Sequence, residues 1–385
     1  MARAKAGGVD TSGEGSLSAR LVSRFSQDKD IGGVIKLGSG SLRSDIPYYI
    51  STQVATVDYA IGQPGIPASR VTTIYGREGS GKSTLVYHIL AECQRMGGIS
   101  VLVDSEQRFT RARAGAMGLN ANDLLVVDGA TLEKAFDAIE KVIDFARNDN
   151  FDIPICVAYD SLAGSVSKKR LDAEVGTVVT ASVAKFVNAE LPRLKMKCSE
   201  HGVALVIVNQ VRSRIQDFSD PRSRGYQERN KVMGSKQAMI AEWPLLFESS
   251  LMLYVNTTGT LGSDPLKPEG VAARVKVTKS GISPHEGWRG NFELGENGIN
   301  LEQAKWDVLE MVGIIEHASG GWYTIRLAPG AAPMDKKMQR KDFATLLTQH
   351  PELDKIVQAA PTLWKTGNDE QLPTGEDAVQ PDEAD

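Results

Sequence analysis

Short apolar runs alternate along the middle of the chain with segments in which apolar residues recur every three or four positions. The runs have the length and β-branched character of buried strands, and the longer segments have the period of a helix face. Nearly continuous apolar strands joined by helices are typical of a parallel sheet covered by helices on both faces. We expect strands at 71–75, 99–103, 124–127, 155–159 and 204–208, with helices at 83–96, 132–147 and 177–200.

The pattern changes after residue 250. Three closely spaced runs contain glycine and threonine and predict an antiparallel extension of the sheet, at 251–255, 271–278 and 290–294. The following segment, 301–365, is mixed and predicts a small α+β domain. Its expected core comprises Trp306, Leu309, Trp322, Tyr323, Phe343, Leu346, Leu347 and Ile356.

The two ends of the chain are poor in large apolar side chains. Near the N-terminus, Leu17, Leu21, Val22 and Phe25 recur at helical spacing, and a helix this short needs a surface to pack on. The last twenty residues hold seven acidic and no basic side chains, which predicts a disordered acidic tail. We therefore expect an N-terminal arm with its linker (1–44), a core (45–300), a small C-terminal domain (301–365) and the tail (366–385).

Composition excludes several classes of protein. Of the 385 residues, 41% are hydrophobic and 24% are charged, as in soluble globular proteins, and no apolar run has the roughly 18 residues that a bilayer span requires. No apolar signal segment follows the first basic residues, so we expect a cytoplasmic protein without membrane contact. The three cysteines lack metal or disulfide spacing and predict reduced core thiols. The net charge of −4 disfavours nucleic-acid binding, but the acidic tail hides a mildly basic body.

Residues 76–84 read GREGSGKST and match the pattern GxxxxGK[ST] between a predicted strand and a predicted helix. Glycines let the backbone wrap a phosphate, and the amides of the loop and of the helix N-terminus then face its negative charge. The alternative is a glycine turn that only caps a helix. The expected ATP-binding residues are Gly76, Arg77, Glu78, Gly79, Ser80, Gly81, Lys82, Ser83 and Thr84, with Lys82 on the β- and γ-phosphates and Ser83 on Mg²⁺.

Polar residues follow three of the predicted strands, at the edge where α/β proteins bind ligands. Asp160 is a candidate magnesium ligand, or else a helix cap. Glu106 is a candidate general base for the attacking water, or else a solvated loop carboxylate. The amides Asn209 and Gln210 either sense the γ-phosphate or form an ordinary polar strand end.

Two basic segments leave the same edge of the predicted sheet. Residues 211–236 carry seven basic and three acidic side chains and include Phe218 and Tyr226. A long loop of this composition, directly after Gln210, predicts that the protein binds an anionic polymer with an affinity that depends on the bound nucleotide. The alternative is a solvated basic loop. The second segment follows Asp160 and contains Lys168, Lys169 and Arg170.

In their order along the chain, these motifs resemble the RecA/UvsX family of homologous-recombination ATPases, from about residue 50 to residue 322. The matching text is GREGSGKST, VLVDSE, VAYDSLAGSVSKK, VIVNQVRSRI, ARVKVTKS and GENGIN. The first motif is common to many ATPases. The set in this order is much more specific, and NQVRxxI followed by a basic loop is typical of recombinases.

The resemblance implies a RecA-type P-loop ATPase core with ATP and Mg²⁺ as cofactors. It implies a DNA-dependent ATPase that forms helical filaments on single-stranded DNA and catalyses homologous pairing and strand exchange in recombination and repair. Expected partners are single-stranded DNA, homologous double-stranded DNA, further copies of the chain, a single-strand-binding protein and a loading mediator. The SVSKK segment and the divergent N-terminus favour a phage-encoded member, acting in a bacterial cell or a phage-infected host.

The resemblance also assigns roles to residues. Glu106 corresponds to the catalytic base, Gln210 to the switch between ATP and DNA, and Asp160 with Ser83 to the magnesium ligands. Lys279 corresponds to a lysine that reaches the γ-phosphate held by the neighbouring subunit, and Arg113 stands where the family stacks an aromatic on adenine. The DNA-binding loops fall at about 166–181 and 211–236, with the candidate contacts Lys168, Lys169, Arg170, Lys185, Arg212, Arg214, Ile215, Arg222, Arg224 and Arg229.

The chain departs from the family pattern at one interface position. Gly281 stands where bacterial members usually have a second interface lysine, and Arg274 and Lys276 are candidate replacements. Two other functions compete with the recombinase. A hexameric replicative helicase shares the ATPase core, but the N-terminal arm and small C-terminal domain fit it poorly. A regulatory nucleotide switch that binds only protein is disfavoured by the arginines of 211–236.

Overall fold

The computed structural model describes residues 16–28, 36, 45–149, 152–173, 182–213, 237–262, 264, 267–328, 331–334 and 337–366. The chain divides into two compact units, Met1–Asp45 and Ile46–Asp385. The first unit contains helix α1 (Leu17–Phe25), which begins where the Ser16 hydroxyl accepts a hydrogen bond from the amide of Ala19 at 3.2 Å. The predicted N-terminal helix is therefore present.

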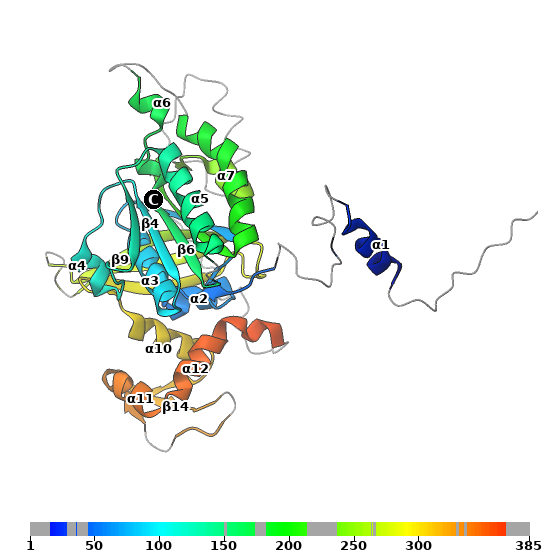
Figure 1. The fold of residues 1–385 in the computed structure, drawn as a ribbon. Coiled ribbons are helices and arrows are strands. Elements are labelled where there is room, and N and C mark those ends of the chain that lie inside the picture. The colour runs from blue at the N-terminus through cyan, green and yellow to red at the C-terminus, as the bar shows by residue number, and fades with distance from the viewer. Residues whose placement is uncertain are drawn as a thin grey trace, which may run out of the picture. The chain divides into compact units, whose positions relative to one another are not determined.

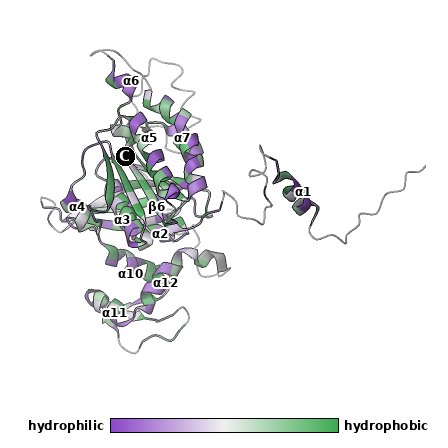
Figure 2. Cartoon of the chain, in the orientation of Figure 1, coloured by the Kyte–Doolittle hydropathy of each residue, from purple (hydrophilic) through white to green (hydrophobic). Residues whose placement is uncertain are grey.

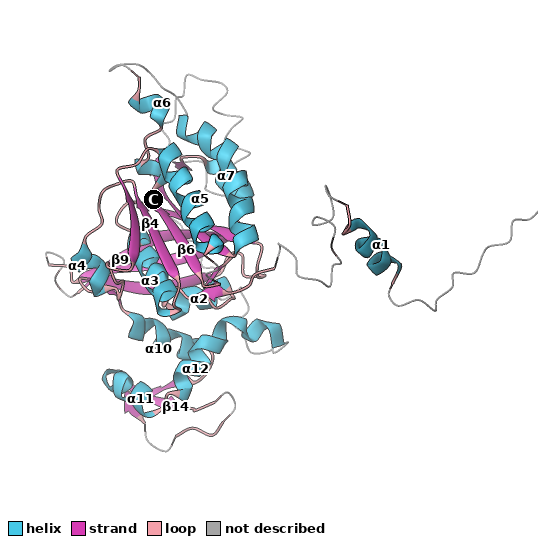
Figure 3. Cartoon of the chain, viewed as in Figure 1, coloured by secondary structure: helices cyan, strands magenta, loops and turns pink. Residues whose placement is uncertain are grey.

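The second unit is built on a ten-stranded sheet (Figures 1 and 3). Its order is β12-β11-β10-β9-β3-β7-β6-β4-β5, with β8 paired to β7. The pairings from β5 to β9 are parallel and those from β9 to β12 are antiparallel, which confirms the expected fold class. The strands are β3 (Arg70–Gly76), β4 (Ile99–Asp104), β5 (Leu124–Asp128), β6 (Ile155–Asp160), β7 (Val203–Ser213), β8 (Gln237–Met239), β9 (Leu251–Leu261), β10 (Gly270–Ser280), β11 (Arg289–Gly295) and β12 (Gly298–Ile299).

Successive side chains of the central strands enter different cores, because they point to opposite faces of the sheet. On β4, Val101 and Val103 pack with helices α5 and α7, whereas Leu102 packs with α2 and α3. Figure 2 shows the hydrophobic colour concentrated along the strands between these helices. The helices of this unit that precede the C-terminal segment are α2 (Ala55–Ile61), α3 (Lys82–Arg95), α4 (Arg111–Ala116), α5 (Leu132–Asn148), α6 (Lys168–Leu171), α7 (Ser182–His201) and α9 (Glu242–Glu248).

Strand β5 departs from the expectation of coverage on both faces. It is an edge strand, and Leu125 and Val126 are 47% and 39% exposed. The apolar run predicted a strand correctly, but the run itself carries no information about which strand ends the sheet.

The C-terminal segment packs onto the core rather than enclosing a core of its own. Trp306 is 1% exposed and meets the rings of Tyr323 and Phe343 edge-on, in a cluster continuous with the α3 face of the sheet. Trp322 is 43% exposed, so its predicted place in this core is wrong. The elements are α10 (Leu301–Met311), β13 (Ile315–Ser319), β14 (Trp322–Ile325), β15 (Met338–Gln339), α11 (Phe343–Gln349) and α12 (Glu352–Ala359), with a three-stranded sheet β13-β14-β15.

Two further predictions concern membranes and cysteines. Among the described helices, none combines the length and apolar character needed to cross a bilayer. Cys93, Cys156 and Cys198 are free and buried, and burial raises the pKa of each thiol. The prediction of reduced core thiols is confirmed.

Candidate nucleotide and DNA site

The loop between β3 and α3 has the geometry of a phosphate cradle. At Gly76, an added Cβ would lie 1.9 Å from the carbonyl oxygen of Val255 on β9, so only glycine fits. Gly81 precedes α3 with φ +94°, a conformation that side chains rarely adopt. The backbone therefore turns sharply and presents the N-terminus of a 14-residue helix to the loop.

Lys82 lies within this loop and is 6% exposed. Its Nζ donates to the carbonyl oxygen of Arg77 at 2.6 Å, across the turn that a phosphate group would occupy. Burial lowers the pKa of Lys82, while the carboxylates of Asp160 and Glu106 counteract that shift. The ammonium group is held where a triphosphate would replace a backbone carbonyl as its partner.

Asp160 ends β6 beside the loop. Burial raises the pKa of its carboxyl group, and a hydrogen bond with Ser83 is the largest opposing influence. A hydroxyl and a carboxylate oxygen side by side are the hard oxygen ligands that Mg²⁺ prefers. These two residues therefore fit a magnesium ion, and a bound cation would also offset the cost of burying the carboxylate.

Glu106 and Gln210, which were predicted separately, lie against each other. Strand β7 pairs with β3 so that Gln210 lies opposite Gly76, and the side-chain amide of Gln210 donates to Oε1 of Glu106 at 2.6 Å. The hydroxyl of Ser161 donates to the same oxygen. The candidate base is thus linked directly to the strand that continues into the arginine-rich segment.

Asn209 has a different role from its neighbour. It is fully buried, and its amide nitrogen donates to the carbonyl oxygen of Ile240 at 2.6 Å. Its oxygen accepts from the backbone amide of Gln210 at 2.9 Å. These bonds fix the end of β7. Of the two alternatives for Asn209, they favour an ordinary polar strand end over a sensor of the γ-phosphate.

Arg113 lies beside the start of α3. Its Nη2 donates to the hydroxyl of Thr84 at 3.1 Å, and its guanidinium lies 5.7 Å from the centre of the Tyr87 ring. Arg113 therefore adjoins the predicted phosphate loop, as a residue that contacts the nucleotide base would.

The predicted DNA contacts fall partly within the described residues. Lys168, Lys169 and Arg170 form the exposed helix α6, and Lys185 is exposed near the start of α7. The hydroxyl of Ser167 donates to that of Ser182 at 2.9 Å, which ties the two described ends of the first loop together. Arg212 lies on β7, but its side chain lies outside the described part, as do Arg214, Ile215, Arg222, Arg224 and Arg229.

Comparison with known proteins decides the family. A family model described as the RecA N-terminal domain matches residues 19–240, more than half of the chain. The chain belongs to the RecA family. It is 30% identical to Protein RecA of Chlorobaculum tepidum over 334 residues, which cover 86% of this chain and 90% of that protein. It is 29% identical to Protein RecA of Thioalkalivibrio sulfidiphilus over 350 residues, 90% of this chain and 92% of that protein.

Family membership establishes the general function. The protein is an ATP-dependent recombinase of the RecA family, acting in DNA recombination and repair, and the helicase alternative is not favoured. As members of this family do, it binds DNA and assembles into oligomeric filaments.

Lys279, the predicted intersubunit residue of this RecA-family chain, lies on β10 next to helix α9. Its Nζ donates to the carbonyl oxygen of Leu246 at 2.5 Å, and burial followed by the charge of Lys195 lowers its pKa. On the same helix, Trp243 and Phe247 stack at 5.9 Å and are 38% and 68% exposed. Exposed aromatic side chains are enriched at protein interfaces, and this pair lies on the helix whose Leu246 carbonyl accepts from Lys279.

Sequence reasoning missed two residues at this site. Ser161 was not among the expected site residues, yet its hydroxyl donates to Glu106. Arg108 was not considered, yet its guanidinium bridges Glu78 of the phosphate loop and Glu106, with N–O distances of 2.8 and 3.2 Å. A basic residue two positions after the candidate base was the available signal, but spacing does not say where a loop side chain points.

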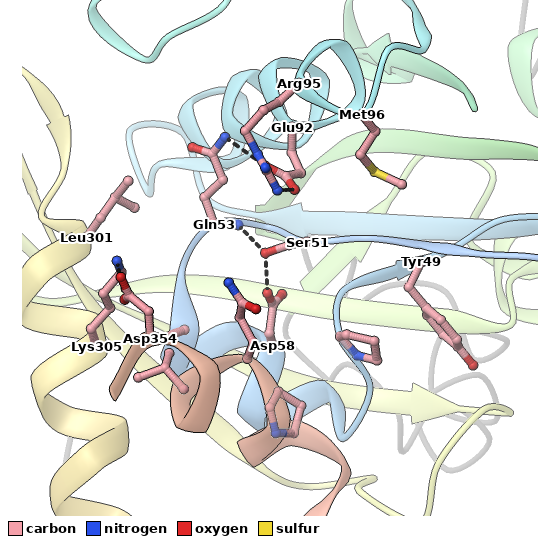
Figure 4. Close-up of a pocket in the computed structure, with 15 residues that line it drawn as sticks. Tyr49, Ser51, Gln53, Asp58, Glu92, Arg95, Met96, Leu301, Lys305 and Asp354 are labelled. Carbon is pink, nitrogen blue, oxygen red and sulfur yellow. Dashed lines mark hydrogen bonds and ion pairs between the residues drawn. The ribbon is translucent and has the colours of Figure 1, made fainter. Parts of the chain in front are cut away.

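A second polar cluster lies at the opposite end of α3. It lines a cavity of about 540 Å³ between α2, α3, α10 and α12 (Figure 4). Glu92 pairs with Arg95 and accepts from Gln53 at 3.4 Å, and Lys305 of α10 pairs with Asp354 of α12 at 2.7 Å. Each of these charges already has a partner within the protein.

Proposed function

We propose that this recombinase forms helical filaments on single-stranded DNA, pairs that strand with homologous duplex DNA and exchanges strands under the control of bound ATP. The observation that carries the proposal is the 2.6 Å hydrogen bond between Gln210 and Glu106. It joins the candidate base for hydrolysis to β7, the strand that enters the segment 211–236 with its seven basic side chains. A change at the γ-phosphate is thereby transmitted to the DNA-binding segment through one amide.

Each step of hydrolysis has a candidate residue. Lys82 would bind the β- and γ-phosphates, and Ser83 with Asp160 would hold Mg²⁺, whose charge would offset that of the phosphate oxygens. Glu106 accepts a proton from the attacking water. Arg113 contacts the nucleotide base. Lys279 reaches the γ-phosphate of ATP bound to the neighbouring copy, and its position next to the exposed Trp243–Phe247 pair supports that intersubunit role.

The proposed DNA contacts lie in segments that leave the same edge of the sheet. We assign one set of DNA contacts to the α6 segment and Lys185. We assign the second set to Arg212, Arg214, Ile215, Arg222, Arg224 and Arg229. Basic side chains bind the phosphates, while Ile215 separates groups of bases. Helix α1 serves as the polymerisation arm, and the acidic tail competes with duplex DNA for basic surface.

The remaining partners and the cellular setting stay predictions. We expect a single-strand-binding protein and a loading mediator, a cytoplasmic location and a phage origin. At the interface, Arg274 and Lys276 are the candidates to replace the lysine absent at Gly281.

Electron microscopy of the protein with single-stranded DNA and a slowly hydrolysed ATP analogue tests the assembly. Helical filaments are the expected result. Closed rings would instead indicate the helicase, and dispersed particles would indicate a nucleotide switch.

Replacing both Arg212 and Arg214 with alanine tests the coupling. We expect the variant to lose DNA-stimulated ATP hydrolysis while it still binds nucleotide, since both changes lie beyond the γ-phosphate contact. The matched control replaces Lys141 and Lys197, which pair with Asp137 and Asp144 of helix α5, and should keep the stimulation. Persistent stimulation in the arginine variant would show that the DNA site is wrongly placed.

A further inference from the structure

Arg108 has a fixed backbone at the carboxyl edge of the sheet. Asp104, the last residue of β4, accepts hydrogen bonds from the backbone amides of Arg108 at 3.2 Å and of Phe109 at 2.8 Å. Asp104 is 7% exposed, so this anchor is buried. The loop that follows β4 is therefore held over the strand end, and the side chain of Arg108 starts from a defined position.

The guanidinium of Arg108 extends from this anchor into the nucleotide site. Its Nη2 lies 2.8 Å from Oε1 of Glu78, within the phosphate loop, and its Nε lies 3.2 Å from Oε2 of Glu106. Its charge also acts on Lys82 and on Asp160. One arginine thus faces the phosphate loop, the candidate base and the candidate magnesium ligand.

These ion pairs leave the guanidinium available for exchange. The side chains of Arg108 and Glu78 are 59% and 66% exposed, and an exposed pair of this kind contributes little to stability. The Glu106 side chain is 14% exposed, so its pair with Arg108 is the more buried of the two, but the arginine end of that pair stays open to solvent. A terminal phosphate carries more negative charge than a carboxylate and matches the two-pronged geometry of a guanidinium. ATP bound in the loop would therefore compete with both glutamates for Arg108.

The contact with Glu106 makes that competition matter for hydrolysis. Oε1 of Glu106 accepts hydrogen bonds from Gln210 and Ser161, and Oε2 forms an ion pair with Nε of Arg108 at 3.2 Å. While all three donors are in place, the carboxylate is poorly arranged to take a proton from water. Departure of Arg108 from Oε2 frees that oxygen and leaves the bonds to Gln210 and Ser161 intact.

We propose that Arg108 moves from Glu106 to the terminal phosphate of the ATP bound in its own subunit, and acts there as an intrasubunit arginine finger. The water oxygen forms a bond to the γ-phosphorus, and the bond from that phosphorus to the bridging oxygen breaks with its electron pair left on ADP. The proton of the water passes to Oε2 of Glu106 and then to solvent. Arg108 stabilises the charge on the transferring phosphoryl group. The inference rests on the proposed function.

Steady-state ATP hydrolysis with saturating single-stranded DNA tests this role in the full chain. We expect Arg108→Ala to lower kcat by about 10²–10³-fold while KM changes less than about tenfold, since the finger acts mainly on the transition state. Arg108→Lys, which keeps the charge without the fork, should recover part of the loss. The matched control Arg111→Ala removes an exposed arginine three positions further along and should stay within about twofold of the wild type.

Several outcomes would overturn the inference. An unchanged kcat in Arg108→Ala would assign the arginine to a structural contact. Faster hydrolysis without DNA would make it an inhibitory latch on Glu106. Should the alanine variant unfold, the kcat of Arg108→Lys decides, and equality with the wild type counts against the finger. A wild type that shows no stimulation by DNA would refute the proposed function itself, whereas normal stimulation with an insensitive Arg108 refutes only this inference.

Discussion

The two ends of helix α3 carry polar clusters that differ in how their charges are satisfied. At the N-terminal end, Lys82 bonds to a backbone carbonyl and Arg108 is shared between two carboxylates. At the C-terminal end, Glu92 pairs with Arg95 on the same helix, and Lys305 pairs with Asp354 within the C-terminal segment. The first arrangement can exchange partners when an anion arrives, while in the second each charge is paired within its own segment, on α3 or between α10 and α12.

The comparison shows which property distinguishes a functional polar cluster from a structural one. Both lie close to buried ionisable groups whose pKa is shifted, so a shifted pKa does not separate them. What separates them is the backbone: the first cluster lies at the helix N-terminus, where the amides of the first turn are left without carbonyl partners within the helix, next to the loop of Gly76 and Gly81. The comparison predicts large losses of activity at one end and losses of stability at the other.

The largest effect is expected for Lys82→Ala. Removal of the ammonium group from the phosphate loop should lower ATP turnover by at least about 10³-fold, measured as phosphate release with single-stranded DNA present. Lys305→Ala removes a lysine at the other end of α3 and should leave turnover unchanged. Equal losses in both variants would break the distinction between the two ends.

A moderate effect on stability is expected for Glu92→Ala. The Glu92 side chain is only 7% exposed in its pair with Arg95, and its removal also takes away the acceptor of Gln53. Because Arg95 is largely exposed and can be hydrated, the unfolding free energy should fall by only about 1–2 kcal/mol, measured in urea. ATP turnover should be retained. The more exposed pair of Glu190 with Arg193 provides the control, and Glu190→Ala should cost less than about 0.5 kcal/mol.

A second effect on stability, of comparable size and limited to acidic pH, is a pH dependence at Asp58, which lines the cavity beside Glu92. Burial raises the pKa of this carboxyl group to about 6, although Ser51 and Thr52 donate hydrogen bonds to it. The unfolded value is about 3.9, so the folded chain binds more protons between these pH values. The unfolding free energy of the wild type, relative to Asp58→Asn, should therefore fall by about 1–3 kcal/mol as pH rises from about 4 to about 6. A difference that does not vary with pH would show that folding leaves the pKa of Asp58 unchanged.

Local features of this protein were readable from the sequence. Strand and helix segments follow from hydrophobic period, and the phosphate loop follows from glycine spacing, because both depend on residues close together in the chain. Asp160, Glu106 and Gln210 could be placed at one edge of the sheet for the same reason, since each lies within three residues of the end of an apolar run. The resemblance to recombinases then assigned their roles.

Contacts between distant segments were decided only by the tertiary structure. Four findings depend on which strands become neighbours and on how the loops turn. They are the hydrogen bond from Gln210 to Glu106, the ion pair of Arg108 with Glu78, the exposure of Leu125 at the sheet edge and the exposure of Trp322. A hydrophobic pattern records whether a residue tends to be buried, but it does not record against what. Strand order and loop conformation are properties of the whole packed chain, and they determine which charges meet.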